Sequence, residues 1–245
     1  MPYYNPPRQR NLFRKGEPFS FSRSKVDLFV KCPRCFYLDR VHGVDHPPGF
    51  PFNINSAVDT LLKREFDQYR AAGRPHPMIT EHGFDFIPFS HPDLDEWREN
   101  FKGVRARYRD YEFGGAVDDI WINKEEELIV VDYKSTAAAD PVKSIDKDYH
   151  DGYKRQIEFY QWLLRKKGFK VSDHGLFVYC TGDNTLPAFN NEVRFHSHII
   201  THKGNTDWVE PQLDRLIACV ESDAIPASGA ECDQCKYFEA RKMLE

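Results

Sequence analysis

The stretch Gly115-Ala-Val-Asp118, followed by Leu128-Ile-Val-Val-Asp132-Tyr-Lys134, decides the fold of this chain. Residues 111–122 and 128–134 are largely apolar, and the charged residues 123–127 between them are typical of a turn, so the pattern predicts a β-hairpin. With the turn centred on Glu125, residues whose numbers sum to about 250 lie opposite each other. The hairpin therefore places Asp118 within cross-strand contact of Asp132.

Side-chain alternation along a strand decides which charged groups meet. Asp132 and Lys134 point to one face and Asp118 joins them there, whereas Asp119 and Tyr133 point away. The apolar run 128–131 indicates a central strand, where an unpaired carboxylate is costly to desolvate. A divalent cation would compensate the two aspartates, and the lysine would suit a scissile phosphate or an activated water. Asp-x-Lys alone is also the spacing of an ordinary surface ion pair.

The remainder of the 245-residue chain shows both helical and strand patterns. The four prolines of residues 1–18 predict an arm with little structure of its own, and residues 19–245 are expected to form a single domain with a real core. We expect helices at 22–37, 55–70, 149–167 and 208–222, further strands at 174–180 and 192–201, and a loop-rich stretch at 73–91.

Four of the six cysteines form two C-x-x-C pairs, Cys32-Pro-Arg-Cys35 and Cys232-Asp-Gln-Cys235. No apolar run is long enough to span a bilayer and the first residues lack a signal-peptide pattern, so we expect a cytoplasmic protein with reduced thiols. Paired spacing then indicates a metal site, and sequence chemistry alone favours tetrahedral zinc. The other two cysteines, at 180 and 219, are expected in the core.

The net charge of −4 gives no global sign of nucleic-acid binding, so any such surface must be local. Arg105, Arg107 and Arg109 alternate with uncharged residues, and in an extended strand they would share one face. This face is the candidate contact for a nucleic-acid backbone. A solvated strand face is an equally good interpretation of the same pattern.

Three motifs together resemble a known family. Gly115-Ala-Val-Asp118, Val131-Asp132-Tyr133-Lys134 and Gln156-Ile-Glu-Phe-Tyr160 are similar to the RecB-like branch of the PD-(D/E)XK nuclease superfamily, which includes the CRISPR-associated adaptation nucleases and the AddB subunit. The likeness spans about residues 20–240. It implies an α/β restriction-endonuclease-like core, in which a central mixed sheet is flanked by helices and a cysteine-clamped terminal subdomain is attached.

The resemblance also implies roles for individual residues. Asp118, Asp132 and the Tyr133 carbonyl would be metal ligands and Lys134 would position or polarise the water, while Gln156 and Tyr160 would orient the site and the DNA strand. The metal-binding histidine usual on the early helix is missing. Its place falls in Asn55-Ser-Ala-Val-Asp59, so Asp59 is the candidate replacement, with Glu65 a weaker one and an ordinary exposed helix residue the alternative.

The same resemblance implies a [4Fe-4S] cluster at Cys32, Cys35, Cys232 and Cys235, although the relatives divide their cysteines one and three rather than two and two. It implies a Mg²⁺- or Mn²⁺-dependent deoxyribonuclease acting on single-stranded DNA or free ends, with protein partners in a repair or CRISPR-adaptation complex. The alternative is a non-catalytic DNA-binding or assembly module that retains the nuclease fold and the metal clamp.

Overall fold

The computed structural model describes residues 11–47, 49 and 53–244, and its contacts divide the chain into two compact units. Unit 1 takes Met1–Phe50, Arg107–Phe113 and Asp207–Glu245, and unit 2 takes Pro51–Ala106 and Gly114–Thr206. Most of the predicted arm, residues 1–10, lies outside the described residues. The single domain over 19–245 stays a prediction. Among the described residues, no helix has the length and apolar character needed to cross a membrane.

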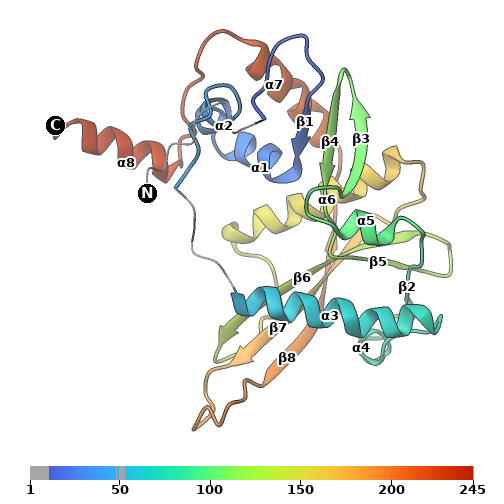
Figure 1. Ribbon diagram of the computed structural model, residues 1–245. Coiled ribbons are helices and arrows are strands. Elements are labelled where there is room, and N and C mark those ends of the chain that lie inside the picture. The colour runs from blue at the N-terminus through green and yellow to red at the C-terminus, as the bar shows by residue number, and fades with distance from the viewer. Residues whose placement is uncertain (1–10, 48, 50–52, 245) are drawn as a thin grey trace. The chain divides into compact units, whose positions relative to one another are not determined.

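A five-stranded mixed sheet with the order β2-β5-β6-β7-β8 forms the centre of unit 2 (Figure 1). Strands β6 and β7 pair in parallel, and the other neighbours pair antiparallel. The mixed sheet flanked by helices confirms the predicted α/β fold class. The strands are β2 (Ile87–Pro88), β5 (Asp119–Ile122), β6 (Leu128–Ala138), β7 (His174–Asp183) and β8 (Phe195–Lys203), and the helices are α3 (Asn53–Ala71), α4 (Pro77–Glu81), α5 (Leu94–Arg98) and α6 (Asp151–Lys166).

The register of β5 and β6 is the one that the sequence predicts. Asp119 lies opposite Val131 and Ile122 opposite Leu128, so the paired residue numbers sum to 250. The predicted strand 111–122 is nevertheless wrong as one element, because the chain bends at 116–118 between β4 (Tyr111–Gly115) and β5. The two strands belong to different sheets.

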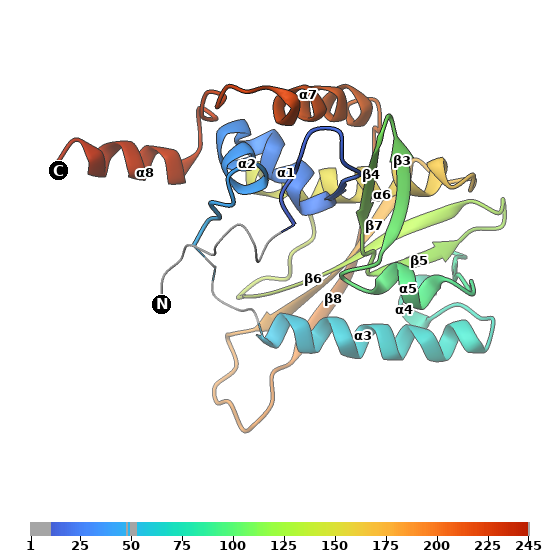
Figure 2. The ribbon, with the colours of Figure 1, turned by 45° about the horizontal axis from the view of Figure 1, so that its top comes forward.

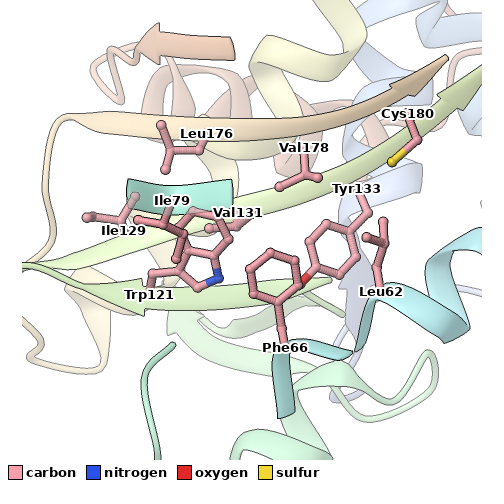
Figure 3. Close-up of a cluster of buried hydrophobic side chains, with 10 residues drawn as sticks. All are labelled: Leu62, Phe66, Ile79, Trp121, Ile129, Val131, Tyr133, Leu176, Val178 and Cys180. Atoms are coloured by element: carbon pink, nitrogen blue, oxygen red, sulfur yellow. The ribbon is translucent and has the colours of Figure 1, made fainter. Parts of the chain in front are cut away.

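Helix α3 lies along one face of the sheet (Figures 1 and 2). Its Leu62 and Phe66 are buried against Trp121, Val131 and Tyr133 (Figure 3), and the ring centroid of Phe66 lies 5.1 Å from that of Trp121. Burying a side chain of this size contributes about 1.5–3 kcal/mol. Because side chains alternate along β6, the even-numbered residues face the other side of the sheet, which α6 covers.

Unit 1 contains an aromatic core and the cysteines of both C-x-x-C pairs. Its helices are α1 (Arg23–Lys31), α2 (Pro33–Arg40), α7 (Val209–Glu221) and α8 (Asp233–Lys242), and β1 (Ser20–Ser22) opens a three-stranded sheet with the order β1-β4-β3, in which β3 is Val104–Tyr108. Phe13 is buried and stacks on Phe21, so this residue of the predicted arm packs against the aromatic core. Phe21 in turn stacks on Phe113.

The structure divides one predicted helix and adds a helix that was not predicted. The helix predicted at 22–37 breaks at Cys32, because Pro33 disfavours helical backbone in the residue before it and opens a new helix instead. The tail around Cys235 forms α8, a helix that its weakly amphipathic sequence does not predict. The predicted helices at 55–70, 149–167 and 208–222 are confirmed as α3, α6 and α7 within a few residues.

Candidate active site

Asp118 directly precedes β5 and lies beside the part of β6 that β5 does not pair with. The last β6 residue paired with β5 is Val131, and beyond it the backbone N–H of Tyr133 donates a 2.9 Å hydrogen bond to Oδ2 of Asp118. The carboxylate thus takes the place that a further strand residue would occupy. In a strand the N–H and C=O of one residue point to the same side, so the Tyr133 carbonyl also faces the side on which Asp118 lies.

Asp132 is fully buried on the α6 side of the sheet. Within the described residues, neither of its carboxylate oxygens has a hydrogen bond of good geometry, and the ammonium of Lys134 forms an ion pair with Oδ2. Burial raises the pKa of Asp132 to about 7, with Asp118 adding to the rise and Lys134 opposing it. The three charged groups predicted to converge are therefore brought together.

The Lys134 side chain is held between a carboxylate and an aromatic ring. Its Nζ lies 4.7 Å from the centroid of the Tyr153 ring on α6, in addition to its ion pair with Asp132. Both contacts restrict the position of the ammonium group. Tyr153 belongs to none of the sequence motifs, so its contact with this lysine was missed.

Helix α3 places Asp59 near Asp118, with Lys63 in contact with both carboxylates. Its Oδ2 lies 2.9 Å from Nζ of Lys63, one turn further along the helix, and that Nζ lies 3.7 Å from Oδ1 of Asp118. Burial and the negative charge of Asp118 both raise the pKa of Asp59 against the opposing effect of Lys63. Glu65, the weaker candidate, contacts His76 instead, with 2.9 Å between Oε1 and Nε2.

Gln156 and Tyr160 lie one turn apart on α6, and Nε2 of Gln156 is 3.5 Å from the Tyr160 hydroxyl. Gln156 is three residues beyond Tyr153, which places the two on the same side of the helix. The Tyr160 ring is buried. The tyrosine therefore fixes the amide that the sequence analysis assigned to orienting the site.

A second buried carboxylate, Asp119, links α3 and α5 to the Tyr133 side chain of β6. Oδ1 forms ion pairs with Arg70 of α3 and Arg98 of α5, and Oδ2 accepts hydrogen bonds from the Tyr133 hydroxyl at 2.7 Å and from Trp121 Nε1 at 3.1 Å. Burial alone would raise the pKa of Asp119, but the two guanidinium groups outweigh it and the pKa is lowered. The sequence predicted that Asp119 points away from the site, and its partners were missed because they lie far away in the chain.

The three arginines proposed for nucleic acid do not share one strand. Arg105 and Arg107 lie in β3, whereas Arg109 has a left-handed backbone with φ of 54° in the turn after it. Arg109 forms an ion pair with Asp214, at 3.1 Å between Nε and Oδ1. The predicted common face of all three is therefore wrong, because the strand ends one residue before Arg109. Their contact with nucleic acid stays a prediction.

All four predicted cysteine ligands come together in unit 1. The Sγ atoms of Cys32, Cys35, Cys232 and Cys235 lie within 4.8 Å of one another, and three of their separations are 3.5, 3.5 and 3.8 Å. We call these residues the cysteine cluster.

The peptide chain also contributes to the cysteine cluster. The N–H of Gly229 donates to Sγ of Cys32 at 3.2 Å. Burial opposes ionisation, but this N–H and that of Cys35 lower the pKa of Cys32 to about 7, while burial raises the pKa of Cys235 to about 11. Such a site stabilises one thiolate first and suits a cation that would stabilise the others.

Comparison with known proteins agrees with this geometry. The model of the PD-(D/E)XK nuclease superfamily matches residues 54–240, a range that includes the carboxylates and Lys134. No curated protein matches the chain. Among solved structures, the chain is similar to the one described as "Crystal structure of SSO0001", at 14% identity and a TM-score of 0.38 over 87% of this chain and 81% of that chain.

Proposed function

Because this chain belongs to the PD-(D/E)XK nuclease superfamily, we propose that it is a Mg²⁺- or Mn²⁺-dependent deoxyribonuclease of the RecB-like type. It hydrolyses phosphodiester bonds in single-stranded DNA or at free DNA ends. The reaction takes place at Asp118, Asp132 and Lys134. The contact of Gln156 with Tyr160 supports the RecB-like assignment.

The state of Asp132 is the observation that carries the proposal. A buried carboxylate without hydrogen bonds is costly unless a positive charge compensates it. The ion pair with Lys134 compensates only part of the cost, since the pKa of Asp132 remains raised to about 7. Asp118, Asp59 and the Tyr133 carbonyl add oxygen donors, which are the ligands that Mg²⁺ and Mn²⁺ prefer. The donor set therefore fits a hard divalent cation.

The side chains around this cation site have different roles in hydrolysis. The bound cation would activate water and stabilise the charge that develops on the phosphate. Lys134, held by Asp132 and the Tyr153 ring, places a positive charge beside the phosphate and orients the attacking water. Gln156 contributes an amide fixed by Tyr160 for contact with the strand being cut. Arg105 and Arg107 of β3 supply further contacts to the DNA backbone.

For the cysteine cluster we propose a structural metal that ties α1 and α2 to α8. Zinc bonds thiolates at about 2.3 Å in a tetrahedron, which sets sulfur atoms about 3.8 Å apart. The separations of 3.5, 3.5 and 3.8 Å support zinc. A [4Fe-4S] cluster, the assignment that the resemblance implies, needs the thiolates further apart because each binds a different iron. Metal analysis and the visible spectrum of the purified protein separate the two.

The test of the nuclease is cleavage of end-labelled oligonucleotides by the purified protein. We expect single-stranded DNA to be cut with Mn²⁺ or Mg²⁺ and to remain intact with EDTA or Ca²⁺, since Ca²⁺ holds ligands in looser geometry. Labels at either end reveal the polarity of cutting. DNA that is bound but never cut in any of these metals would contradict the proposal and favour the non-catalytic binding module.

A further inference from the structure

A pocket of about 900 Å³ adjoins the proposed active site in unit 2. It is lined by the first turns of α3, by β6 from Tyr133 onward and by the segment leading into α6. In Figures 1 and 2 the N-terminal end of α3 and the C-terminal end of β6 lie at the same end of the sheet. Two residues of the site, Asp59 and Lys134, belong to its wall.

Several aromatic side chains form part of the wall of this pocket. Tyr153 and Tyr179 line it, and Tyr179 is almost fully buried. Tyr149 differs from both, since 66% of its surface is exposed. A tyrosine ring that lines a pocket and remains this exposed offers a free face to a ligand.

The Tyr149 ring contacts a buried histidine and lies near a lysine. The ring lies edge-on to buried His150, with 4.1 Å between the centroids. The centroid of the His150 ring lies 5.6 Å from that of Tyr153. Nζ of Lys147 lies 5.7 Å from the centroid of Tyr149. An exposed aromatic ring beside Lys147, in a pocket that Lys134 also lines, is a combination that can bind an unpaired base and its phosphates.

We propose that Tyr149 is the stacking platform for an unpaired nucleobase of the strand whose phosphate reaches Lys134. This inference rests on the proposed nuclease function and specifies its substrate as nucleic acid with unstacked bases next to the scissile bond. A base in a closed duplex keeps both faces stacked on its neighbours, so only a single strand, a flap or a frayed end can place a base against this ring. Tyr149 is a positioning residue and takes no part in proton transfer.

Fluorescence of 2-aminopurine tests the stacking directly. Single-stranded oligonucleotides that carry the reporter at successive positions are titrated with wild-type protein, Tyr149→Phe and Tyr149→Ala in EDTA, so that nothing is cut. Phe189→Ala is the matched control, because Phe189 is also 66% exposed and does not line the pocket. Thermal unfolding of each variant shows that it is folded.

We expect the wild type and Tyr149→Phe to quench the reporter at one position. Tyr149→Ala is expected to lose that quenching and to bind single strands about 5- to 150-fold more weakly, as stacking of one base predicts. Its affinity for a blunt duplex of the same sequence should not change. Phe189→Ala should behave as the wild type.

The inference and the nuclease proposal fail in different ways. Equal quenching by Tyr149→Ala and the wild type, or an equal loss of affinity for duplex and single strand, overturns the stacking role even if DNA is cut. Quenching that disappears in Tyr149→Ala of a protein that cleaves nothing keeps the stacking site and overturns the nuclease.

Discussion

The hydrogen bond from the Tyr133 backbone N–H to Oδ2 of Asp118 joins a carboxylate to the open edge of the central strand. Side chains from the loop before β5, from β6 and from α3 meet at this point. The side chain of the same tyrosine is anchored as well, because its hydroxyl donates a hydrogen bond to Asp119. The consequences of this arrangement can be measured one residue at a time.

Asp132→Asn is expected to stabilise the metal-free protein. The amide is isosteric and neutral, so it is cheaper to bury than the carboxylate, which has no good hydrogen bond in the described structure. We expect a gain of about 1–3 kcal/mol in the free energy of unfolding in EDTA. Denaturant titration measures it, with exposed Asp140→Asn as the control. A loss of stability would show that the ion pair with Lys134 outweighs the burial cost.

Asp119→Ala is expected to destabilise unit 2 strongly. Arg70 and Arg98 are both nearly buried and would lose their buried partner, keeping only the more exposed carboxylate of Asp67. Removing one partner from a buried ion pair costs about 3–5 kcal/mol. Because Asp118 is the next residue, activity should fall even at temperatures where the variant is still folded. A melting temperature within a degree or two of the wild type would contradict the anchoring role.

Asp39 predicts a pH dependence for unit 1. Its carboxylate is fully buried and accepts hydrogen bonds from Arg40 at 2.9 and 3.1 Å, and Lys25 forms an ion pair with it. Burial raises its pKa, but Arg40 and Lys25 outweigh burial and lower it below the ordinary value of 3.8. A lowered pKa in the folded state means stability that is present above about pH 4 and lost as the pH falls further.

The corresponding variant is Asp39→Asn. We expect the wild type to exceed it by about 1–3 kcal/mol in the free energy of unfolding at pH 7. The difference should narrow steadily between pH 4 and the acid limit of folding. Urea titrations across this range measure it, and a difference that is independent of pH would refute the assignment.

Gly229→Ala is expected to loosen the cysteine cluster. A Cβ at this position would lie 2.2 Å from the Lys31 carbonyl oxygen, so the loop must move and its N–H must leave the Cys32 sulfur. We expect faster release of the metal to a chelator and weaker thermal stability of the metal-loaded protein. Ala230→Ser, one residue further, is the control. Unchanged release would mean that the Gly229 contact does not support the site.

Much of the candidate site could be predicted from sequence because it depends on strand periodicity. The hairpin register follows from a single turn, and with it the approach of Asp118 to Asp132. The break at Cys32 was also within reach, since Pro33 is visible in the sequence. The bend before β5 was not, because it depends on which sheet each strand joins.

The residues that sequence reasoning missed act through distant contacts. Lys63 and Tyr153 belong to different helices and have no motif of their own, and only the folded sheet brings them to Asp118 and Lys134. The spacing of Asp59 and Lys63, one helical turn apart, was the available signal. It is too common on helices to be informative alone. The turn at Arg109 was also missed, because nothing in the sequence distinguishes this left-handed turn residue from a strand residue.

We propose that the buried carboxylate beside Lys134 is part of a cation-dependent phosphodiesterase site. The most direct measurement is the initial rate at which an end-labelled single-stranded oligonucleotide is cut with Mn²⁺ by Asp132→Asn and by the exposed-surface control Asp140→Asn. We predict a loss of about 100-fold or more for Asp132→Asn and no change for the control. Cleavage by Asp132→Asn at the wild-type rate would contradict the claim.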